Sequence, residues 1–128
     1  MGGFHLEYLA VAVGGMVGAL ARYVLTGWVI KINESPFPYG TMIVNLVGSF
    51  LLGFSATLLM DRFQGHPYLG PLITVGILGS FTTFSTFQYE SWQLIKTGMV
   101  HLALVNFFGS ITLGLAVLWI GVTLARWL

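Results

Sequence analysis

The distribution of apolar residues divides the chain into four long hydrophobic segments separated by short polar connectors. A helix needs about 20 mostly apolar residues to cross the hydrocarbon core of a bilayer, and each segment reaches that length. Because lipid offers the backbone no hydrogen-bond partners, helices are expected and the predicted fold class is all-α. The predicted transmembrane spans are residues 8–30, 41–60, 69–95 and 99–125, and in the third the apolar run ends at Tyr89.

Composition supports a lipid environment. Of the 128 residues, 56% are hydrophobic and 7% are charged, whereas soluble domains carry roughly 25% charged residues. The connectors are too short to hold a soluble domain, so residues 1–128 are interpreted as a single transmembrane domain. A net charge of +1 provides no basic patch for nucleic acid, and the absence of cysteine excludes disulfides and thiolate metal sites.

The basic residues that flank the spans give little preference for one orientation. With four crossings, Arg62 and Arg126 fall on one side of the membrane and Lys31 and Lys96 on the other, while Arg22 lies within the first span. Orientation normally follows the side with more Lys and Arg. Two interpretations stay open: the chain inserts both ways and forms an antiparallel dimer, or Arg22 alone fixes one orientation.

The third span has a composition that a lipid-facing helix does not need. Its central run, GILGSFTTFSTF at residues 76–87, combines two glycines with five hydroxyl residues and three phenylalanines. One interpretation is that the hydroxyls bond back to carbonyls of the preceding turn while the rings pack. The other, which the concentration of these features favours, is that Gly76, Gly79 and the hydroxyl cluster interrupt the helix. Irregular backbone inside a membrane protein can bind ions.

Other polar side chains at membrane depth occur as pairs on one helix face. Thr41 and Asn45 are four residues apart in the second span, and Asn106 and Ser110 are four apart in the fourth. Polar side chains are costly in hydrocarbon unless they meet a partner or a water-filled path. These four residues are therefore candidates for lining a pore.

The motifs resemble the Fluc/CrcB family of fluoride-selective ion channels. The matching strings are GALARY (18–23), GTMIVNLVG (40–48), GILGSFTTFSTF (76–87) and GS (109–110). The resemblance covers essentially the whole chain, with the motifs in order and at similar spacing. The resemblance implies a dual-topology, antiparallel homodimer with two fluoride pores, embedded in the lipid of a bacterial inner membrane. Such a channel would export fluoride by passive conduction and protect the cell from its toxicity.

The resemblance also implies which residues form the sites. A structural sodium ion at the dimer centre would be bound by backbone carbonyls that correspond to Gly79 and Thr82. Arg22 is assigned to a vestibule, with a topology anchor as the alternative. The predicted fluoride-pore residues are Asn45, Phe84, Phe87, Thr41, Thr83, Ser85, Asn106 and Ser110.

The chemistry of these residue types agrees with an anion that is a strong hydrogen-bond acceptor. Asn, Ser and Thr supply donors, and the edge of a phenyl ring carries the positive part of its quadrupole. A fully charged site would hold the anion too tightly for conduction. The middles of the second, third and fourth spans contain no Lys or Arg.

Two other functions are alternatives to a channel. A small drug/proton antiporter needs a membrane-buried carboxylate, but Glu7 and Glu90 lie towards span ends. An assembly subunit without transport activity leaves the pattern of the third span unexplained. An enzyme is not expected, because His5, His66 and His101 are scattered without metal-ligand spacing.

Overall fold

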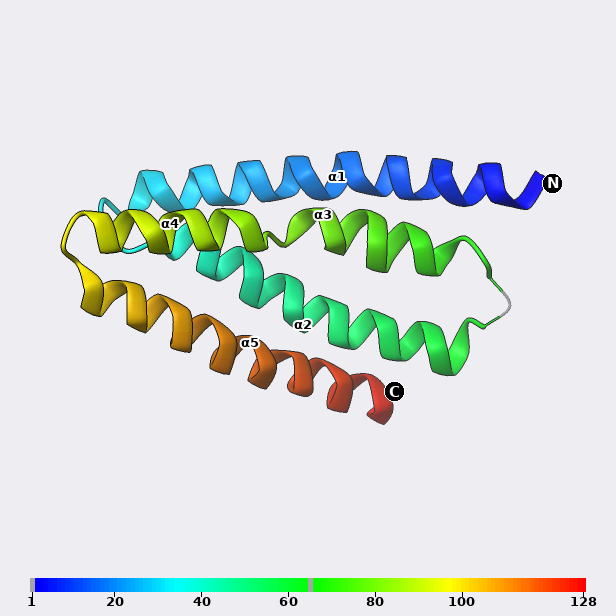
Figure 1. Ribbon diagram of the computed structural model, residues 1–128. Coiled ribbons are helices and arrows are strands. Elements are labelled where there is room, and N and C mark those ends of the chain that lie inside the picture. Colours follow the sequence, from blue (N-terminus) through cyan, green and yellow to red (C-terminus); the bar gives the residue numbers. More distant parts are fainter. Residues whose placement is uncertain (1, 65) are drawn as a thin grey trace.

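The computed structural model describes residues 2–64 and 66–128, and every regular element among them is a helix, which confirms the predicted all-α class. The helices form an elongated bundle in which the connectors 33–38 and 97–99 lie at one end, and residues 63–64 and 66–68 lie towards the other (Figure 1). Element η1 is a π-helix. The elements are α1 (Gly2–Ile32), α2 (Tyr39–Arg62), η1 (Pro71–Leu78), α3 (Gly79–Phe81), α4 (Phe84–Lys96) and α5 (Val100–Trp127).

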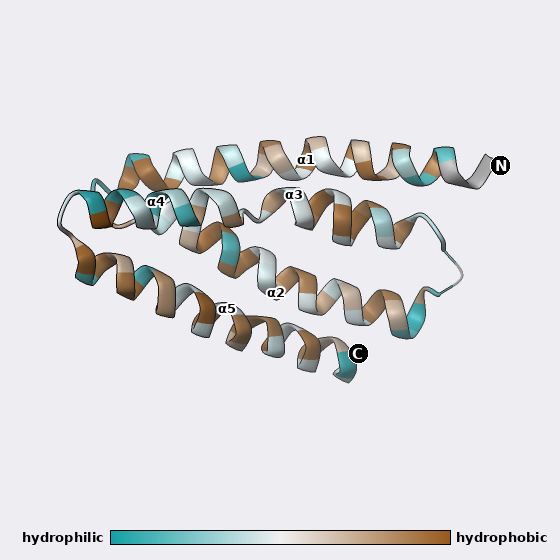
Figure 2. Ribbon diagram, in the orientation of Figure 1, coloured by the Kyte–Doolittle hydropathy of each residue, from teal (hydrophilic) through white to brown (hydrophobic). Residues whose placement is uncertain are grey.

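Three of the described helices are long and apolar enough to cross a membrane: His5–Ile32 within α1, Tyr39–Arg62 and Val100–Trp127. They correspond to the first, second and fourth predicted spans. The third predicted span contains no single helix of that length, because η1, α3 and α4 divide it. Hydrophobic residues follow the lengths of the helices, and hydrophilic residues gather at their ends and in α4 (Figure 2). The three helices indicate a membrane protein.

Glycines allow the helices to approach closely. Helix α1 packs against η1 and α3, while α2 packs against α5. A Cβ atom on Gly14 would lie 3.0 Å from the Cα of Gly76, and one on Gly18 would overlap the carbonyl oxygen of Ile77. Because Gly14 and Gly18 have no side chains, α1 and η1 can pack at this short distance.

Helical conformation stops at Thr82 and Thr83, which separate α3 from α4. Their φ and ψ angles are extended, at −77° and 155° for Thr82 and −147° and 117° for Thr83. The sequence analysis expected Gly76 and Gly79 to take part in an interruption, but both are helical, with Gly76 in η1 and Gly79 at φ −64° and ψ −34°. Helices α3 and α4 lie end to end in Figure 1, so two helix ends meet within the length of the bundle.

Candidate functional site

Asn45 of α2 holds the extended segment between α3 and α4. The backbone N–H of Thr83 donates to Asn45 Oδ1 at 2.8 Å, and Asn45 Nδ2 donates to the carbonyl oxygen of Thr83 at 3.1 Å. One side-chain amide thus pairs with both backbone groups of one residue. The hydroxyl of Thr83 accepts from the backbone N–H of Thr86 at 3.4 Å, which makes Thr83 the N-cap of α4.

Arg22 of α1 binds the end of α3. Its Nε donates to the carbonyl oxygen of Ser80 at 3.0 Å. Carbonyls at a helix C-terminus lack intrahelical donors and carry the negative end of the helix dipole, so a guanidinium is favourable there. The sequence analysis assigned Arg22 to a vestibule or to a topology anchor. The structure adds a direct contact between Arg22 and the end of α3, which directly precedes the interrupted segment, Thr82 and Thr83.

Two backbone carbonyls lose their usual helix donors at this point. In a continuous helix, the N–H groups of Thr83 and Thr86 would donate to the carbonyls of Gly79 and Thr82. Here those N–H groups donate to the side chains of Asn45 and Thr83 instead. Within residues 2–64 and 66–128 there is no cluster of three or more His, Cys, Asp or Glu that could hold a metal. Binding of a sodium ion by the carbonyls of Gly79 and Thr82 stays a prediction.

A pocket of about 270 Å³ lies beside the interrupted segment. The rings of Phe84 and Phe87 are 6.0 Å apart between centroids. Phe87 is 5% exposed, whereas Phe84 is 70% exposed on the single chain. No charged residue lines this phenyl pocket, which is formed by Asn45, Ser49, Leu52, Thr82, Thr83, Phe84, Phe87, Ser110 and Ile111.

One further cavity shares a wall with the phenyl pocket, and a second shares a wall with that cavity but not with the phenyl pocket. The arginine pocket, of about 240 Å³, is lined by Ala19, Arg22, Tyr23, Thr26, Thr41, Thr83 and Thr86. The wide pocket, of about 660 Å³, lies between the connector that follows α1 and the helices α2 and α4. Thr83 lines both the phenyl and the arginine pockets, and Thr41 lines both the arginine and the wide pockets.

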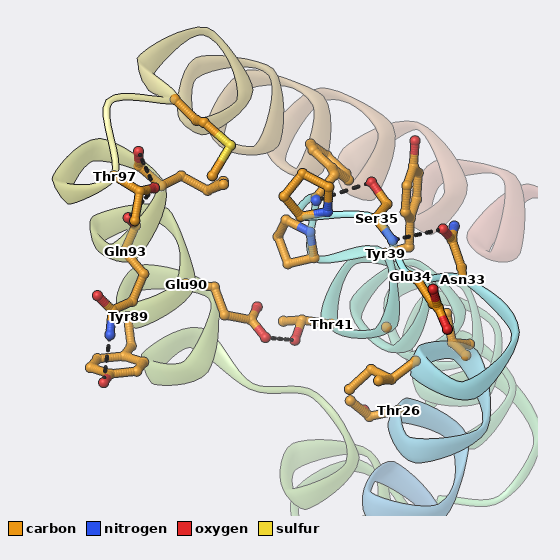
Figure 3. A pocket seen from close by; sticks show the side chains of 18 of the residues that line it. Thr26, Asn33, Glu34, Ser35, Tyr39, Thr41, Tyr89, Glu90, Gln93 and Thr97 are labelled. Carbon is orange, nitrogen blue, oxygen red and sulfur yellow. Dashed lines mark hydrogen bonds between the residues drawn. The ribbon is translucent and has the colours of Figure 1, made fainter.

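Glu90 of α4 contributes a carboxylate to the wide pocket. Thr41 Oγ1 donates to Glu90 Oε1 at 2.8 Å, and the two side chains point towards one another in Figure 3. Glu90 Oε2 is buried and has no hydrogen-bond partner in the part of the chain that is described. From the sequence, Glu90 enters only as a possible antiporter carboxylate. The contact with Thr41 is not visible in the sequence because the two residues are 49 positions apart.

Most of the predicted pore residues come together, although their roles towards fluoride stay predictions. Thr41 lies away from the phenyl pocket, at the arginine and wide pockets. Asn106 is 1% exposed and bonded to Ser110, whereas Ser85 is exposed and lines none of the three pockets. The predicted residues that line the phenyl pocket are Asn45, Thr83, Phe84, Phe87 and Ser110.

Comparison with known proteins gives a consistent family. Residues 9–122 match the family model described as CrcB-like protein, Camphor Resistance (CrcB). A relative from Solibacter usitatus, named Fluoride-specific ion channel FluC, is 44% identical over 121 residues, which cover 94% of this chain and 99% of the relative. Relatives of the same name from Hahella chejuensis and Magnetococcus marinus are 42% and 43% identical, over 95% and 91% of this chain and 94% of each relative. The chain therefore belongs to the CrcB-like family.

Proposed function

We propose that this chain forms a fluoride-selective ion channel that exports fluoride by passive conduction across a bacterial inner membrane and so protects the cell from fluoride toxicity. The relatives named above are fluoride-specific ion channels, and the three apolar helices suit a membrane protein. A channel moves an ion without converting it, so the protein is not an enzyme. The observation that carries the proposal is the uncharged phenyl pocket beside the interrupted segment.

The lining of the phenyl pocket suits a small, strongly hydrated anion. Amide and hydroxyl groups can donate hydrogen bonds in place of water, and ring edges present weak positive charge. Conduction requires sites that an ion can leave. The phenyl pocket has amide, hydroxyl and ring-edge groups and no full charge in its wall, so it meets that requirement.

The shared walls of the three pockets support a path along the bundle. Thr83 stands between the phenyl and arginine pockets, and Thr41 stands between the arginine and wide pockets. The Thr83 hydroxyl donates to Thr86 Oγ1 at 2.9 Å and the Thr41 hydroxyl donates to Glu90 Oε1 at 2.8 Å. Each hydroxyl would therefore turn away from its partner to donate to a fluoride ion moving past it. In this reading Arg22 attracts the anion near the path and also holds the end of α3.

We further propose an antiparallel homodimer with two pores. Backbone that is irregular at membrane depth must be covered by protein or line a wet cavity, yet the extended residues Thr82 and Thr83 are only partly buried on the single chain, and the adjacent Phe84 is exposed. A second copy in the opposite orientation would cover this region, and each copy would supply one phenyl pocket. The nearly balanced Lys and Arg on the two sides of the chain support insertion in both orientations.

The orientation is tested with a reporter fused to either terminus. Dual insertion is expected to give signal on both sides of the membrane, and adding two or three Lys to one connector should shift the signal to one side. A unique orientation of the unaltered protein would exclude the antiparallel dimer.

A structural sodium ion at the centre of this dimer fits the released carbonyls of Gly79 and Thr82. Backbone carbonyl oxygens are ligands that alkali cations accept in place of water. Each copy would provide these two groups, so the ion would join the two interrupted segments. The proposal predicts that sodium, and not potassium, slows dissociation of the purified dimer, and equal dissociation rates in the two salts would count against it.

Fluoride efflux from liposomes that contain the purified protein tests the channel itself, with chloride as the control anion. Fast fluoride efflux and little chloride efflux are expected. Equal fluxes, or none, would reject the proposed function. An antiporter would instead couple cation movement to protons through a carboxylate such as Glu90, so a cationic substrate with a pH gradient provides the contrasting assay.

Substitution of the rings tests their role. Phe84→Ile and Phe87→Ile retain apolar side chains but remove the positive ring edges, so fluoride flux is expected to fall while assembly survives. Phe→Tyr or Phe→Met at the same positions should be tolerated better, because an aromatic edge or a polarizable thioether remains. Undiminished flux in a well-assembled double Ile variant would remove both rings from the mechanism.

A further inference from the structure

Asn106 of α5 bridges two serines on different helices. Its Nδ2 donates to Ser91 Oγ of α4 at 3.0 Å, and its Oδ1 accepts from the hydroxyl of Ser110 at 3.2 Å. The hydroxyl of Ser91 in turn donates to the carbonyl oxygen of Phe87 at 2.8 Å. Because Asn106 is 1% exposed, solvent has little access to this chain of hydrogen bonds.

The direction of these bonds matters for an anion in the phenyl pocket. A serine hydroxyl has one hydrogen, and that of Ser110 is directed at Asn106. Ser110 lines the phenyl pocket, so in this resting arrangement it has no hydrogen left to donate to an anion there. Ser110 therefore lies at the pocket as a hydrogen-bond acceptor and not as a donor.

A half-turn of the Asn106 amide exchanges its oxygen and NH₂ group and so reverses the direction of its hydrogen bonds. The oxygen and NH₂ ends of an amide are nearly alike in shape and differ in hydrogen bonding, so the exchange needs little repacking. In the turned arrangement Nδ2 donates to Ser110 Oγ and Oδ1 accepts from the hydroxyl of Ser91. The hydrogen of Ser110 is then free to point into the phenyl pocket.

We propose that Ser91 and Asn106 are positioning residues that set the direction of the Ser110 hydroxyl, an inference that rests on the proposed fluoride conduction. The resting arrangement contains three hydrogen bonds. The turned arrangement retains two, and a bond from Ser110 to the anion restores the third. The phenyl pocket thus gains a donor when an anion is present. Neither Ser91 nor Asn106 lines the phenyl pocket. Their hydrogen bonds reach it through Ser110 and through the carbonyl of Phe87, and the proposed role is the one through Ser110.

Ser91→Ala is expected to favour the turned arrangement of Asn106. Alanine removes two of the three bonds in the resting arrangement but only one of the two in the turned arrangement. Turning the amide then involves no net loss of a hydrogen bond, whereas in the parent protein it loses one. The fluoride concentration at half-maximal efflux should therefore fall about fivefold, the equivalent of one typical hydrogen bond.

The test is a double-variant cycle with Ser91→Ala and Ser110→Ala, measured as fluoride efflux from liposomes over a range of concentrations. The fivefold shift is expected when Ser110 is intact and should vanish in the Ser110→Ala background. Ser91→Thr keeps the hydroxyl and should behave as the parent. Thr57→Val is the matched control, because the Thr57 hydroxyl also donates to a carbonyl four residues earlier, at 2.8 Å, but lies outside the chain of bonds.

The outcomes separate this inference from the proposed function. The positioning role would be overturned if Ser91→Ala had no effect or shifted the half-maximal fluoride concentration in the opposite direction. It would also be overturned if the shift were the same with and without the Ser110 hydroxyl. In each case a selective parent channel would stay intact. A parent protein that carries no selective fluoride flux would overturn the proposed function instead. If Ser91→Ala does not assemble, Ser91→Cys supplies the same comparison, because a thiol is a weak donor and acceptor.

Discussion

Replacing Asn45 tests whether the interrupted segment depends on a single side chain. Asn45→Leu retains much of the volume but removes both bonds to the Thr83 backbone, at 2.8 and 3.1 Å. A buried polar group without a partner costs about 1 to 3 kcal/mol, so two such groups give a loss of about 2 to 6 kcal/mol in the free energy of unfolding. The lower half of that range is expected, because the Thr83 N–H can return to the carbonyl of Gly79. That return would rebuild a helical turn and distort the phenyl pocket.

The assay is reversible unfolding in detergent micelles, followed by helical circular dichroism, with fluoride efflux measured on the same preparations. Asn45→Asp keeps the acceptor for Thr83 N–H but places an oxygen against the Thr83 carbonyl, so it should be no more stable than Asn45→Leu. Ser49→Ala is the control, because Ser49 lies one turn away on α2 and lines the same pocket. A free energy of unfolding for Asn45→Leu equal to that of Ser49→Ala would refute the reasoning.

Substitutions at four other residues address the surroundings of the site. Gly18→Ala should lower the free energy of unfolding by about 1 to 3 kcal/mol because the new Cβ would overlap the backbone of η1. A Cβ on Gly27 would meet no atom within 4 Å, so Gly27→Ala should raise the free energy of unfolding by up to about 1 kcal/mol. Denaturation midpoints equal to that of the parent protein would contradict both expectations. Thr41→Val removes the donor to Glu90 and should destabilise the protein by about 1.5 to 3 kcal/mol, while Thr41→Ser should not. Similar thermal unfolding of the two Thr41 variants would argue against this role. Arg22→Lys retains charge but loses the rigid guanidinium, so normal assembly with reduced flux is expected, and unchanged flux would show that charge suffices.

The long apolar helices could be predicted from the sequence because hydrophobic length alone identifies them. The position of the interruption could not. Glycine is used both where a helix breaks and where two helices touch, since each requires a missing side chain. In this protein Gly76 meets Gly14 across a helix contact, and the extended residues are Thr82 and Thr83. Only the position of the neighbouring helix distinguishes a glycine at a helix break from a glycine at a helix contact.

The two interpretations of the hydroxyl cluster prove to apply to different residues. Thr82 Oγ1 bonds back to the carbonyl of Leu78 at 3.0 Å, as the packing interpretation expected. Thr83 instead caps α4 and pairs its backbone with Asn45. Nothing in the local pattern assigns these roles, because the choice depends on a partner 38 residues away. Ser91 was missed for the same reason, since its contact with Asn106 joins two helices.

The candidate cation ligands and the phenyl pocket are physically linked through Thr83. Its N–H is taken by Asn45, which releases the carbonyl of Gly79, and its hydroxyl takes the N–H of Thr86, which releases the carbonyl of Thr82. Asn45 and Thr83 also form part of the pocket wall. A change at Asn45 therefore alters a carbonyl ligand and the pocket together, so its effect on ion flux cannot assign a direct role in binding the anion. Ser110 lines the same pocket, and its hydroxyl bonds to Asn106 rather than to the interrupted backbone, which makes that hydroxyl the cleaner probe of anion contact.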